Sequence, residues 1–298
     1  MSFGLSRGSF LTIATLVAFL RGHLIFASGL EADPATGMPV ALLEVPVDST
    51  SADVALALED QAKARQAALD LKLIEAIATR DVSAVKAALD SGAQANAEIP
   101  NPAPAGLAES YTGTPLHYYL KAESGFTVLM FACGLGETEI VETLLAAGAN
   151  PVAKTRKNKT LPIQLAAKAG NTMIQQRLLG VTPDSPATHI SVEVDLVNQM
   201  VFVRDRGTVL LTTPISSGRT SNPTPTGDFV VTDKWKSWTS TIYKVKMPNF
   251  LRLSCSEVGL HAGKLPGYPA SHGCIRLPSD KSKEVYDLVP LGALVTVR

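Results

Sequence analysis

The residues best suited to catalysis lie close together near the C-terminus. Cys274 directly follows Ser271, His272 and Gly273, and His261 precedes them by a short segment. A cysteine that attacks a carbonyl needs a lowered pKa, a nearby base and donors for the oxyanion. His261 or His272 can take the thiol proton, and Gly273 lets the backbone approach closely, so that neighbouring amides can bind an oxyanion. The stretch therefore predicts a nucleophilic cysteine.

Two other interpretations use the same residues. His261, His272, Cys274 and Cys255 could supply four zinc ligands, but structural zinc sites usually pair their ligands as C-x-x-C or H-x-x-x-H, and these spacings fit poorly. The second interpretation is that Cys274 is a core cysteine, but its polar, glycine-flanked setting disfavours this. We expect neither a metal nor an organic cofactor.

The elements around this stretch have the period of strands. From residue 189 on, apolar and polar residues alternate, turns are short, and a Pro/Gly turn at 224–228 leads into a further strand. Strands joined this closely predict an antiparallel sandwich or barrel. The expected strands are 189–196, 199–204, 208–215, 229–232 and 293–297, with one helix at 279–288.

A different period occupies the middle of the chain. Three segments, 73–97, 126–153 and 160–179, each predict a short helix, a turn and a longer helix. With T-P-L-H at 114–117 and L-L-x-x-G-A at 144–149, they resemble ankyrin repeats, interrupted by an insertion that includes 100–106. Such repeats stack and present a surface to a protein partner. In that stack His117 is expected to bond neighbouring backbone, and Cys133 to be buried and inert.

The N-terminus predicts export. Arg7 and the uncharged run 10–20 are typical of a signal peptide, and small residues follow at 27–29. Arg21 and His23 disturb this pattern, so an uncleaved anchor and a buried helix stay open as alternatives. Prolines at 34, 39 and 46 indicate a linker, and strong helix formers begin at Asp53.

Composition excludes several classes of protein. Lys+Arg and Asp+Glu balance at 27 each in 298 residues, so a general electrostatic basis for nucleic-acid binding is absent. Hydrophobic residues make up 46%, which is enough for sizeable cores. Three cysteines are too few for a disulfide scaffold. No apolar run reaches the roughly 18 to 20 residues that span a bilayer.

The C-terminal motifs resemble the L,D-transpeptidase catalytic domain of the YkuD-like type. That family carries a histidine, a spacer, S/T-H-G-C, an apolar residue and Arg or Asn. This chain reads His261 and then Ser271-His272-Gly273-Cys274-Ile275-Arg276. The upstream segments S-S-G-R at 216–219 and T-P-T-G-D-F at 224–229 also match.

The resemblance implies a role for each matching residue. Cys274 corresponds to the nucleophile, which attacks the carbonyl between the third and fourth residues of a peptidoglycan stem peptide, and His261 corresponds to the base. Since Ala262 follows His261, its backbone carbonyl is the local group that can orient the base. His272 and Gly273 correspond to the pair that shapes the site. Substrate contacts are expected from Arg276, Ser271 and Tyr268. Arg276 suits a carboxylate, and a local salt bridge is its alternative.

Together the resemblances imply an α + β multidomain protein, with an N-terminal α-helical ankyrin repeat stack and a C-terminal mainly-β L,D-transpeptidase-like sandwich. The expected parts are a signal peptide or anchor at 1–29, a linker at 30–52, ankyrin repeats at 53–181 and the catalytic domain at 187–298. The expected place is the periplasm or cell envelope, with a role in cell-wall organisation and cell shape.

The sequence does not determine which group accepts the acyl chain from the enzyme. An amine of a second stem peptide would give a cross-link, water would give an L,D-carboxypeptidase, and a lipoprotein lysine would give an anchoring enzyme. A protein that only binds the wall through its repeats is the non-enzymatic alternative. Cys255 is expected to be a buried thiol, with a bridge to Cys133 or Cys274 as alternatives. Trp235, Trp238 and Tyr243 are expected either to cover the site or to pack in the core.

Overall fold

The computed structural model describes residues 15–20, 23–28, 43–46 and 51–298, with side chains from residue 52 onward. The chain divides into two compact units, residues 1–94 and 95–298. Among the residues described, no helix is both long and apolar enough to cross a membrane.

The first unit begins with a small antiparallel sheet. Its strands are β1 (Thr15–Leu20), β2 (His23–Ser28) and β3 (Leu43–Pro46), in the order β1-β2-β3. The rest of the expected signal peptide and linker, at 1–14, 21–22, 29–42 and 47–50, lies outside the described residues.

Two helices complete this unit. Helix α1 (Ser51–Ala78) is continuous, so the helix formers that begin at Asp53 run without a break into the first expected repeat. Helix α2 (Val82–Asp90) starts after Asp81, whose carboxylate accepts a hydrogen bond from the Ala84 amide. Leu73, Ile77 and Val85 are completely buried, and the two helices contact each other.

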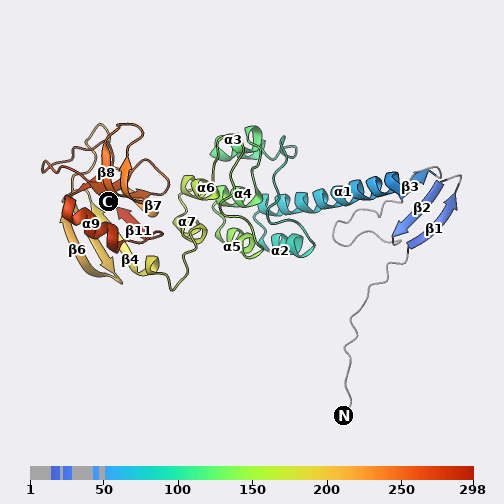
Figure 1. Cartoon of the computed structure of the whole chain (residues 1–298), viewed down its shortest axis with the longest axis horizontal. Helices are drawn as coiled ribbons and strands as arrows, with labels where there is room; N and C mark the ends of the chain where they lie inside the picture. The colour runs from blue at the N-terminus through green and yellow to red at the C-terminus, as the bar shows by residue number, and fades with distance from the viewer. Residues whose placement is uncertain (1–14, 21–22, 29–42, 47–50) are drawn as a thin grey trace, which may run out of the picture. The chain divides into compact units, whose positions relative to one another are not determined.

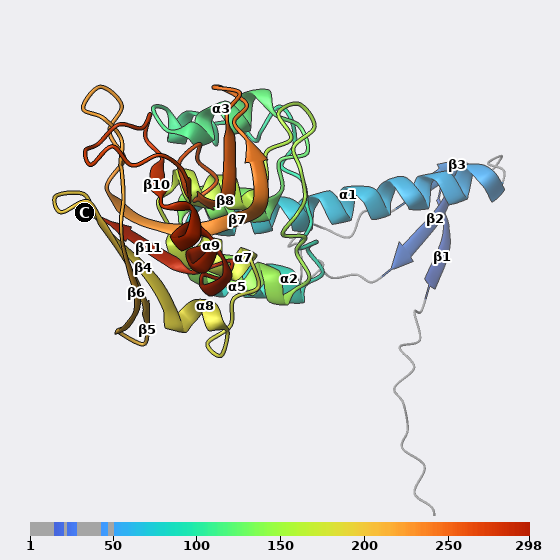
Figure 2. The same cartoon turned by 60° about the vertical axis from the view of Figure 1, so that its left-hand side comes forward.

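The second unit starts with short helices in pairs (Figures 1 and 2). Gly136 ends α4 with a φ of +78°, and Asn171 caps α7 by accepting from the Ile174 amide. The helix–turn–helix pattern expected at 126–153 and 160–179 is confirmed. The expected length order, short helix before longer helix, is wrong at 73–97, where the first helix is the longer one, and at 160–179, where both helices have 7 residues. The elements are η1 (Glu109–Tyr111), α3 (Pro115–Ala122), α4 (Val128–Leu135), α5 (Thr138–Ala146), α6 (Pro162–Lys168) and α7 (Thr172–Leu178).

His117 and Cys133 have the structural environments that the sequence predicts. The Nδ1 atom of His117 lies 2.8 Å from the carbonyl oxygen of Ala108, which ties α3 to the segment before it. Cys133 is fully buried in α4, and burial raises the pKa of its thiol. Both residues therefore stabilise the helical region.

Eight strands form one sheet in the C-terminal part. The order is β10-β9-β8-β7-β11-β4-β5-β6. The long strand β7 pairs with β11 through its first half and with β8 through its second half, so it belongs to both halves of the sheet. The bounds are β4 (Ile190–Asp195), β5 (Met200–Asp205), β6 (Thr208–Pro214), β7 (Gly227–Thr239), β8 (Lys246–Leu253), β9 (Gly259–Ala262), β10 (Ile275–Leu277) and β11 (Leu294–Val297).

The expectation of a purely antiparallel sheet was wrong. Strands β9 and β10 are parallel, and so are β4 and β11. Both connections between these partners are long enough for a crossover, which parallel pairing requires. The helices of this part are the short α8 (Pro186–His189) and α9 (Ser279–Leu288), the latter with the bounds that the sequence predicts.

The two edges of the sheet are joined by backbone hydrogen bonds. Ser216, just beyond β6, exchanges two backbone hydrogen bonds with Arg276 in β10, each 3.0 Å long. An unprotected edge is thereby closed, in the manner of a barrel. This contact places the segment after β6 against the segment that carries Cys274.

Helix α7 contacts the sheet region within the second unit. The Gln176 amide donates to the carbonyl oxygen of Gly292 at 2.8 Å, and a Cβ at Gly292 would lie 2.3 Å from the Val181 side chain. Helical and β segments therefore share a small interface here. The domain boundary expected between 181 and 187 stays a prediction.

Candidate active site

Strands β9 and β10 separate a buried face from a reactive face. Side chains alternate between the two faces of a strand. Leu260, Ile275 and Leu277 are almost completely buried in the core on one face. The register pairs His261 directly with Arg276, which places both side chains on the other face.

Cys274 belongs to the reactive face as well. It comes one residue before β10, and the alternation therefore continues from Arg276 to Cys274. The charge of Arg276 acts on both the Cys274 thiol and the His261 imidazole, as expected for three neighbouring side chains. The strand pair thus brings together the nucleophile, the base and the cation that the sequence predicts.

The ring of His261 is held in one orientation. Its Nδ1 lies 2.8 Å from the carbonyl oxygen of Ala262, and the side chain is buried. Because a carbonyl oxygen only accepts, the proton lies on Nδ1 and Nε2 keeps its lone pair. The expectation that the Ala262 carbonyl orients this ring is confirmed.

The thiol of Cys274 lies beside the segment that leads into β9. Its Sγ is 3.7 Å from the carbonyl oxygen of Glu257, and the Gly259 backbone also hydrogen-bonds the thiol. Burial raises the pKa of Cys274, while the Gly259 contact and the charges of Arg276 and Arg252 oppose that rise. The sulfur is therefore partly shielded, and the Gly259 contact and the two arginine charges offset part of the cost of forming a thiolate.

The surroundings of His261 and Cys274 favour the neutral form of both side chains. Burial lowers the pKa of His261, the Ala262 contact partly opposes this, and the Arg276 charge lowers it further. With the pKa of Cys274 raised, a thiolate–imidazolium pair is disfavoured before substrate binds. The arrangement favours proton transfer during attack, which is general-base catalysis.

Ser271 holds the turn that carries the nucleophile. Its hydroxyl donates to the Cys274 carbonyl and accepts from the Gly273 amide at 3.1 Å. The side chain is almost completely buried. The structure therefore gives Ser271 a supporting role within the turn rather than a free hydroxyl for substrate. Gly273 has a φ of +115°, a conformation that favours glycine.

The loop after β6 fixes the same turn from the other side. The Ser217 carbonyl accepts from the amides of Ala270 and Ser271 at 2.9 Å, and the Arg219 amide donates to the Ser271 carbonyl at 3.0 Å. These contacts explain why the S-S-G-R motif accompanies the cysteine motif. The sequence identifies this motif but does not predict which residues it contacts.

Arg219 also determines which ring nitrogen of His272 carries the proton. Its guanidinium donates to His272 Nε2 at 2.7 Å, so that this nitrogen accepts and the ring proton lies on Nδ1. The ring of Tyr243 contacts His272 with 4.6 Å between centroids. Since His272 is exposed and engaged by Arg219, His261 is the better placed base.

Arg276 presents a charge to the reactive face. Its stem passes over Gly263, where a Cβ would lie only 2.9 Å from the Arg276 Cγ. In the part of the chain that the structure describes, its guanidinium has no hydrogen bond or ion pair. Because a local salt bridge is missing there, the guanidinium is available for a carboxylate of the substrate.

The aromatic residues divide into two groups. The rings of Trp235 and Trp238 stack at 4.6 Å, and Arg252 lies over both at 4.9 and 5.3 Å. This pair is packed together with Phe250. Tyr243 instead lies at the tip of the β7–β8 hairpin, half exposed and against His272. Tyr268 is 61% exposed, and its carbonyl accepts from Ser216.

The three cysteines are free thiols. Cys133 is buried, and Cys255 and Cys274 are partly buried. Cys255 follows β8, where its amide donates to the Thr232 hydroxyl at 2.9 Å, and burial raises the pKa of its thiol. Across residues 52–298, no three side chains of His, Cys, Asp or Glu gather as metal ligands would. Cys255 was expected to be a buried thiol; it is a free thiol, but it is only partly buried.

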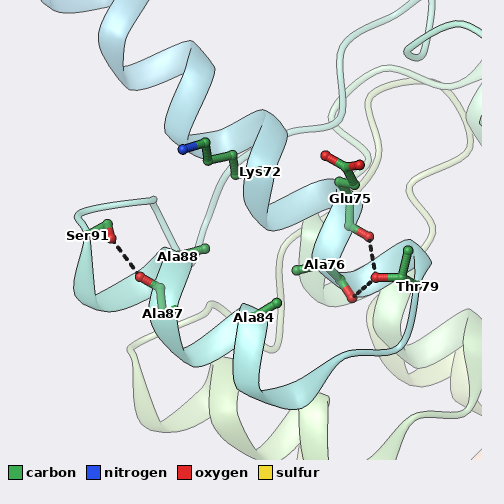
Figure 3. A pocket seen from close by; sticks show the side chains of 8 residues that line it. All are labelled: Lys72, Glu75, Ala76, Thr79, Ala84, Ala87, Ala88 and Ser91. Atoms are coloured by element: carbon green, nitrogen blue, oxygen red, sulfur yellow. Dashed lines mark hydrogen bonds between the residues drawn. The ribbon is translucent and has the colours of Figure 1, made fainter. Parts of the chain in front are cut away.

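A pocket in the first unit carries none of these groups. It lies between α1 and α2, and Figure 3 shows the side chains that line it. The hydroxyls of Thr79 and Ser91 donate to backbone carbonyls of the helices that these residues follow, at 3.0 Å and 2.8 Å. The charged side chains of the pocket lining are Lys72 and Glu75. The pocket is lined by Lys72, Glu75, Ala76, Thr79, Ala84, Ala87, Ala88 and Ser91.

Comparison with known proteins agrees with the site. Residues 189–297 match the sequence profile of the L,D-transpeptidase catalytic domain, and residues 124–156 match that of the ankyrin repeat. Two Bacillus subtilis proteins, YkuD and YciB, are named provisionally as L,D-transpeptidases. YkuD is 29% identical over 136 residues, which cover 44% of this chain and 79% of YkuD. YciB is 28% identical over 134 residues, which cover 37% of this chain and 66% of YciB.

Solved structures of L,D-transpeptidases also match. One from Enterococcus faecium is 32% identical with a TM-score of 0.36, over 40% of this chain and 54% of that one. One from Mycobacterium smegmatis is 26% identical with a TM-score of 0.35, over 37% of this chain and 58% of that one. The chain thus spans little more than half the length of these solved chains.

The profile match covers every residue of the reactive face, and the fold supplies the strand pair that presents them. Residues 189–297 therefore match the L,D-transpeptidase catalytic domain, and residues 124–156, which precede them, match the ankyrin repeat.

Proposed function

We propose that this protein is a peptidoglycan L,D-transpeptidase that uses Cys274 as its nucleophile. The observation that carries this proposal is the shared face of β9 and β10. It combines a thiol, an imidazole with a free Nε2, and an unpaired guanidinium in the described structure. The profile match and the names of the relatives support the reaction class.

The first half-reaction forms a thioester. Cys274 Sγ attacks the carbonyl between the third and fourth residues of a stem tetrapeptide, and His261 Nε2 takes the thiol proton. The tetrahedral oxyanion then collapses, the C–N bond breaks, and His261 returns the proton to the departing amine. Arg276 favours the negative sulfur and provides a cation for a substrate carboxylate.

The second half-reaction transfers the acyl group. An amine of a second stem peptide attacks the thioester carbonyl while His261 accepts its proton. The C–S bond breaks, and Cys274 regains a proton as thiol. The product is a peptide cross-link, and no metal or organic cofactor takes part in these steps.

Incubation with a purified disaccharide-tetrapeptide tests the proposal. Mass analysis should show a dimer that has lost one terminal residue, and Cys274→Ser should give none. A tripeptide without dimer would reassign the protein to the L,D-carboxypeptidases. An unchanged tetrapeptide, from protein whose Cys274 is free, would contradict the proposal.

Cell-wall substrate implies an extracytoplasmic location, and we propose export to the periplasm or cell envelope and a role in cell shape. We also propose that the ankyrin repeats at 53–181 bind a protein partner that places the enzyme at the wall. Fractionation of cells that express the full chain tests the location. Recovery of the protein in the cytoplasmic fraction alone would contradict it.

A further inference from the structure

We propose that Thr224 is a positioning residue which aims the Cys274 backbone amide at the oxyanion. The proposal rests on the proposed function of Cys274. It concerns a residue of the T-P-T-G turn that lies far from the cysteine in sequence and whose hydroxyl is buried beside it.

The hydroxyl of Thr224 has two partners, and together they fix its direction. The Gly218 amide donates to Thr224 Oγ1 at 2.8 Å, and Thr224 Oγ1 lies 2.8 Å from the Gly273 carbonyl oxygen. A carbonyl cannot donate, so the hydroxyl proton must go to Gly273. Thr224 is only 4% exposed, so its hydroxyl is separated from bulk solvent.

The hydrogen bond to the Gly273 carbonyl also fixes the direction of the Cys274 amide. The peptide unit is planar and trans, so the Gly273 C=O and the Cys274 N–H point in opposite directions. With the carbonyl bound by Thr224, the Cys274 N–H points away from Thr224. No acceptor for it is found among the residues that the structure describes.

The neighbouring amide is already occupied. The Gly273 N–H donates to the Ser271 hydroxyl at 3.1 Å. Of the two amides closest to the sulfur, only that of Cys274 is therefore available to the oxyanion. A nucleophile's own amide is a suitable donor, because the new C–S bond brings the oxyanion beside it.

Gly218 makes the arrangement possible. A Cβ at this position would lie 2.3 Å from the Asn222 carbonyl oxygen and 2.5 Å from the Thr224 nitrogen. Only glycine allows the loop to fold back so closely that the Thr224 hydroxyl reaches the Gly273 carbonyl. The S-S-G-R and T-P-T-G motifs thus share one task, which is to set the peptide plane before Cys274.

The test separates two reactions of the same sulfur. A carbapenem acylates Cys274 through an oxyanion: the S–C bond forms, the lactam C–N bond breaks, and the nitrogen takes the proton from His261. Iodoacetamide alkylates the same thiol by displacing iodide, without an oxyanion. A residue that only positions the oxyanion donor should affect the first reaction and spare the second.

In the full chain, Thr224→Val should slow carbapenem acylation about 100-fold, with the loss in the rate constant at saturation. Its iodoacetamide rate should stay unchanged. Thr224→Ser keeps the hydroxyl and should restore acylation. Thr226→Val, in the same loop but exposed, is the matched control and should behave as wild type. Thr224→Ala removes the same hydroxyl and keeps the test available if the valine variant does not fold.

Equal losses in both reactions would overturn the proposal, because Thr224 would then act on the thiol or on the fold. Unchanged acylation in Thr224→Val would overturn it as well. A wild-type protein that reacts with iodoacetamide but not with a carbapenem would instead refute the proposed function, so the two failures are distinguishable.

Discussion

The helical region and the β domain each contain a histidine held by the same contact. The Nδ1 atoms of His117 and His261 both lie 2.8 Å from a backbone carbonyl oxygen. Around His117 this contact ties one helix to a preceding loop. Around His261 it leaves Nε2 free on a strand face that also carries a thiol and a cation. The orienting contact is the same, and the neighbouring groups decide whether it serves structure or catalysis.

The cysteines of the two regions differ in the same way. Burial raises the pKa of both Cys133 and Cys274. For Cys133 burial is the whole cause, whereas at Cys274 the Gly259 backbone and two arginine charges oppose it. Reactivity therefore depends on groups that stabilise a thiolate, more than on exposure alone.

Replacing each of the two cysteines, Cys274 and Cys133, is expected to give the largest difference between the two regions. Cys274→Ser should lower turnover and carbapenem acylation at least about 1000-fold, because a hydroxyl is a far weaker nucleophile without a stronger base. Cys133→Ser should leave the acylation rate unchanged and lower stability, since a polar group enters a dry core. Acylation kinetics by mass spectrometry, with thermal unfolding as control, measure both. A folded Cys274→Ser variant that still turns over would remove Cys274 from its role.

Removing each ring is the next test. His261→Ala should slow acylation by about 10² to 10⁴, the usual contribution of a general base. His117→Ala should keep the acylation rate and lose about 1 kcal/mol of stability through its hydrogen bond. The two variants are compared by acylation rate and by urea unfolding. A large catalytic loss in His117→Ala would refute the separation between structural and catalytic histidines.

The pH dependence of acylation should report the lowered pKa of His261. A base works only when neutral, so activity falls as pH drops through this pKa, and burial moves the fall below about pH 6.5. Arg276→Gln removes a charge that lowers the same pKa, and its acid limb should therefore shift to higher pH. Rates between pH 4.5 and 8 measure both limbs. A shift of the variant's limb to lower pH would contradict the assignment.

Truncation tests whether the two regions are separable. A chain that starts at residue 186 keeps all the proposed catalytic groups but loses the Gln176 hydrogen bond to Gly292 and the Val181 packing. We expect acylation within a few-fold of the full chain and a midpoint of thermal unfolding lower by several degrees. A chain that starts at residue 170 keeps both contacts and is the matched control. If the shorter chain folds but is not acylated, the repeats complete the active site.

Ala262→Ser should have the smallest effect. Residue 262 pairs with Leu277, on the face opposite to His261, so a new hydroxyl would point toward the core and not toward the ring. We expect a change in acylation of no more than a few-fold and a small loss of stability. Acylation and unfolding measurements on this variant check both values. A change by orders of magnitude would show that the carbonyl of residue 262 does not suffice to orient His261.

Local patterns predicted the local parts of the structure. Helix α9 and the tight turn at 205–207 follow from sequence, since helix periodicity and turn residues act over a few positions. Strands β9 and β10, with four and three residues, are too short for an alternation to be recognised. Their parallel pairing depends on chain segments that are distant in sequence.

The residues proposed to be catalytic were predictable from the sequence, but the residues that support them were not. Cys274, His261 and Arg276 belong to one recognisable motif, and the structure brings them to one face. The tasks of Arg219 and Thr224 depend on hydrogen bonds across 53 and 49 residues of chain. No periodicity encodes such contacts, although two motifs recurring together could have indicated that they meet.

The support of Gly273 by Thr224 also bears on the order of folding. The two residues are 49 positions apart, and the intervening chain includes the whole β7–β8 hairpin. Closing such a loop costs entropy that only later contacts repay, so the nucleophile's peptide plane is set late. Until then the Cys274 amide is not aimed at the oxyanion, and the thiol lacks the burial that raises its pKa in the folded chain. We therefore expect an incompletely folded molecule to escape carbapenem acylation, so that acylation reports completed folding.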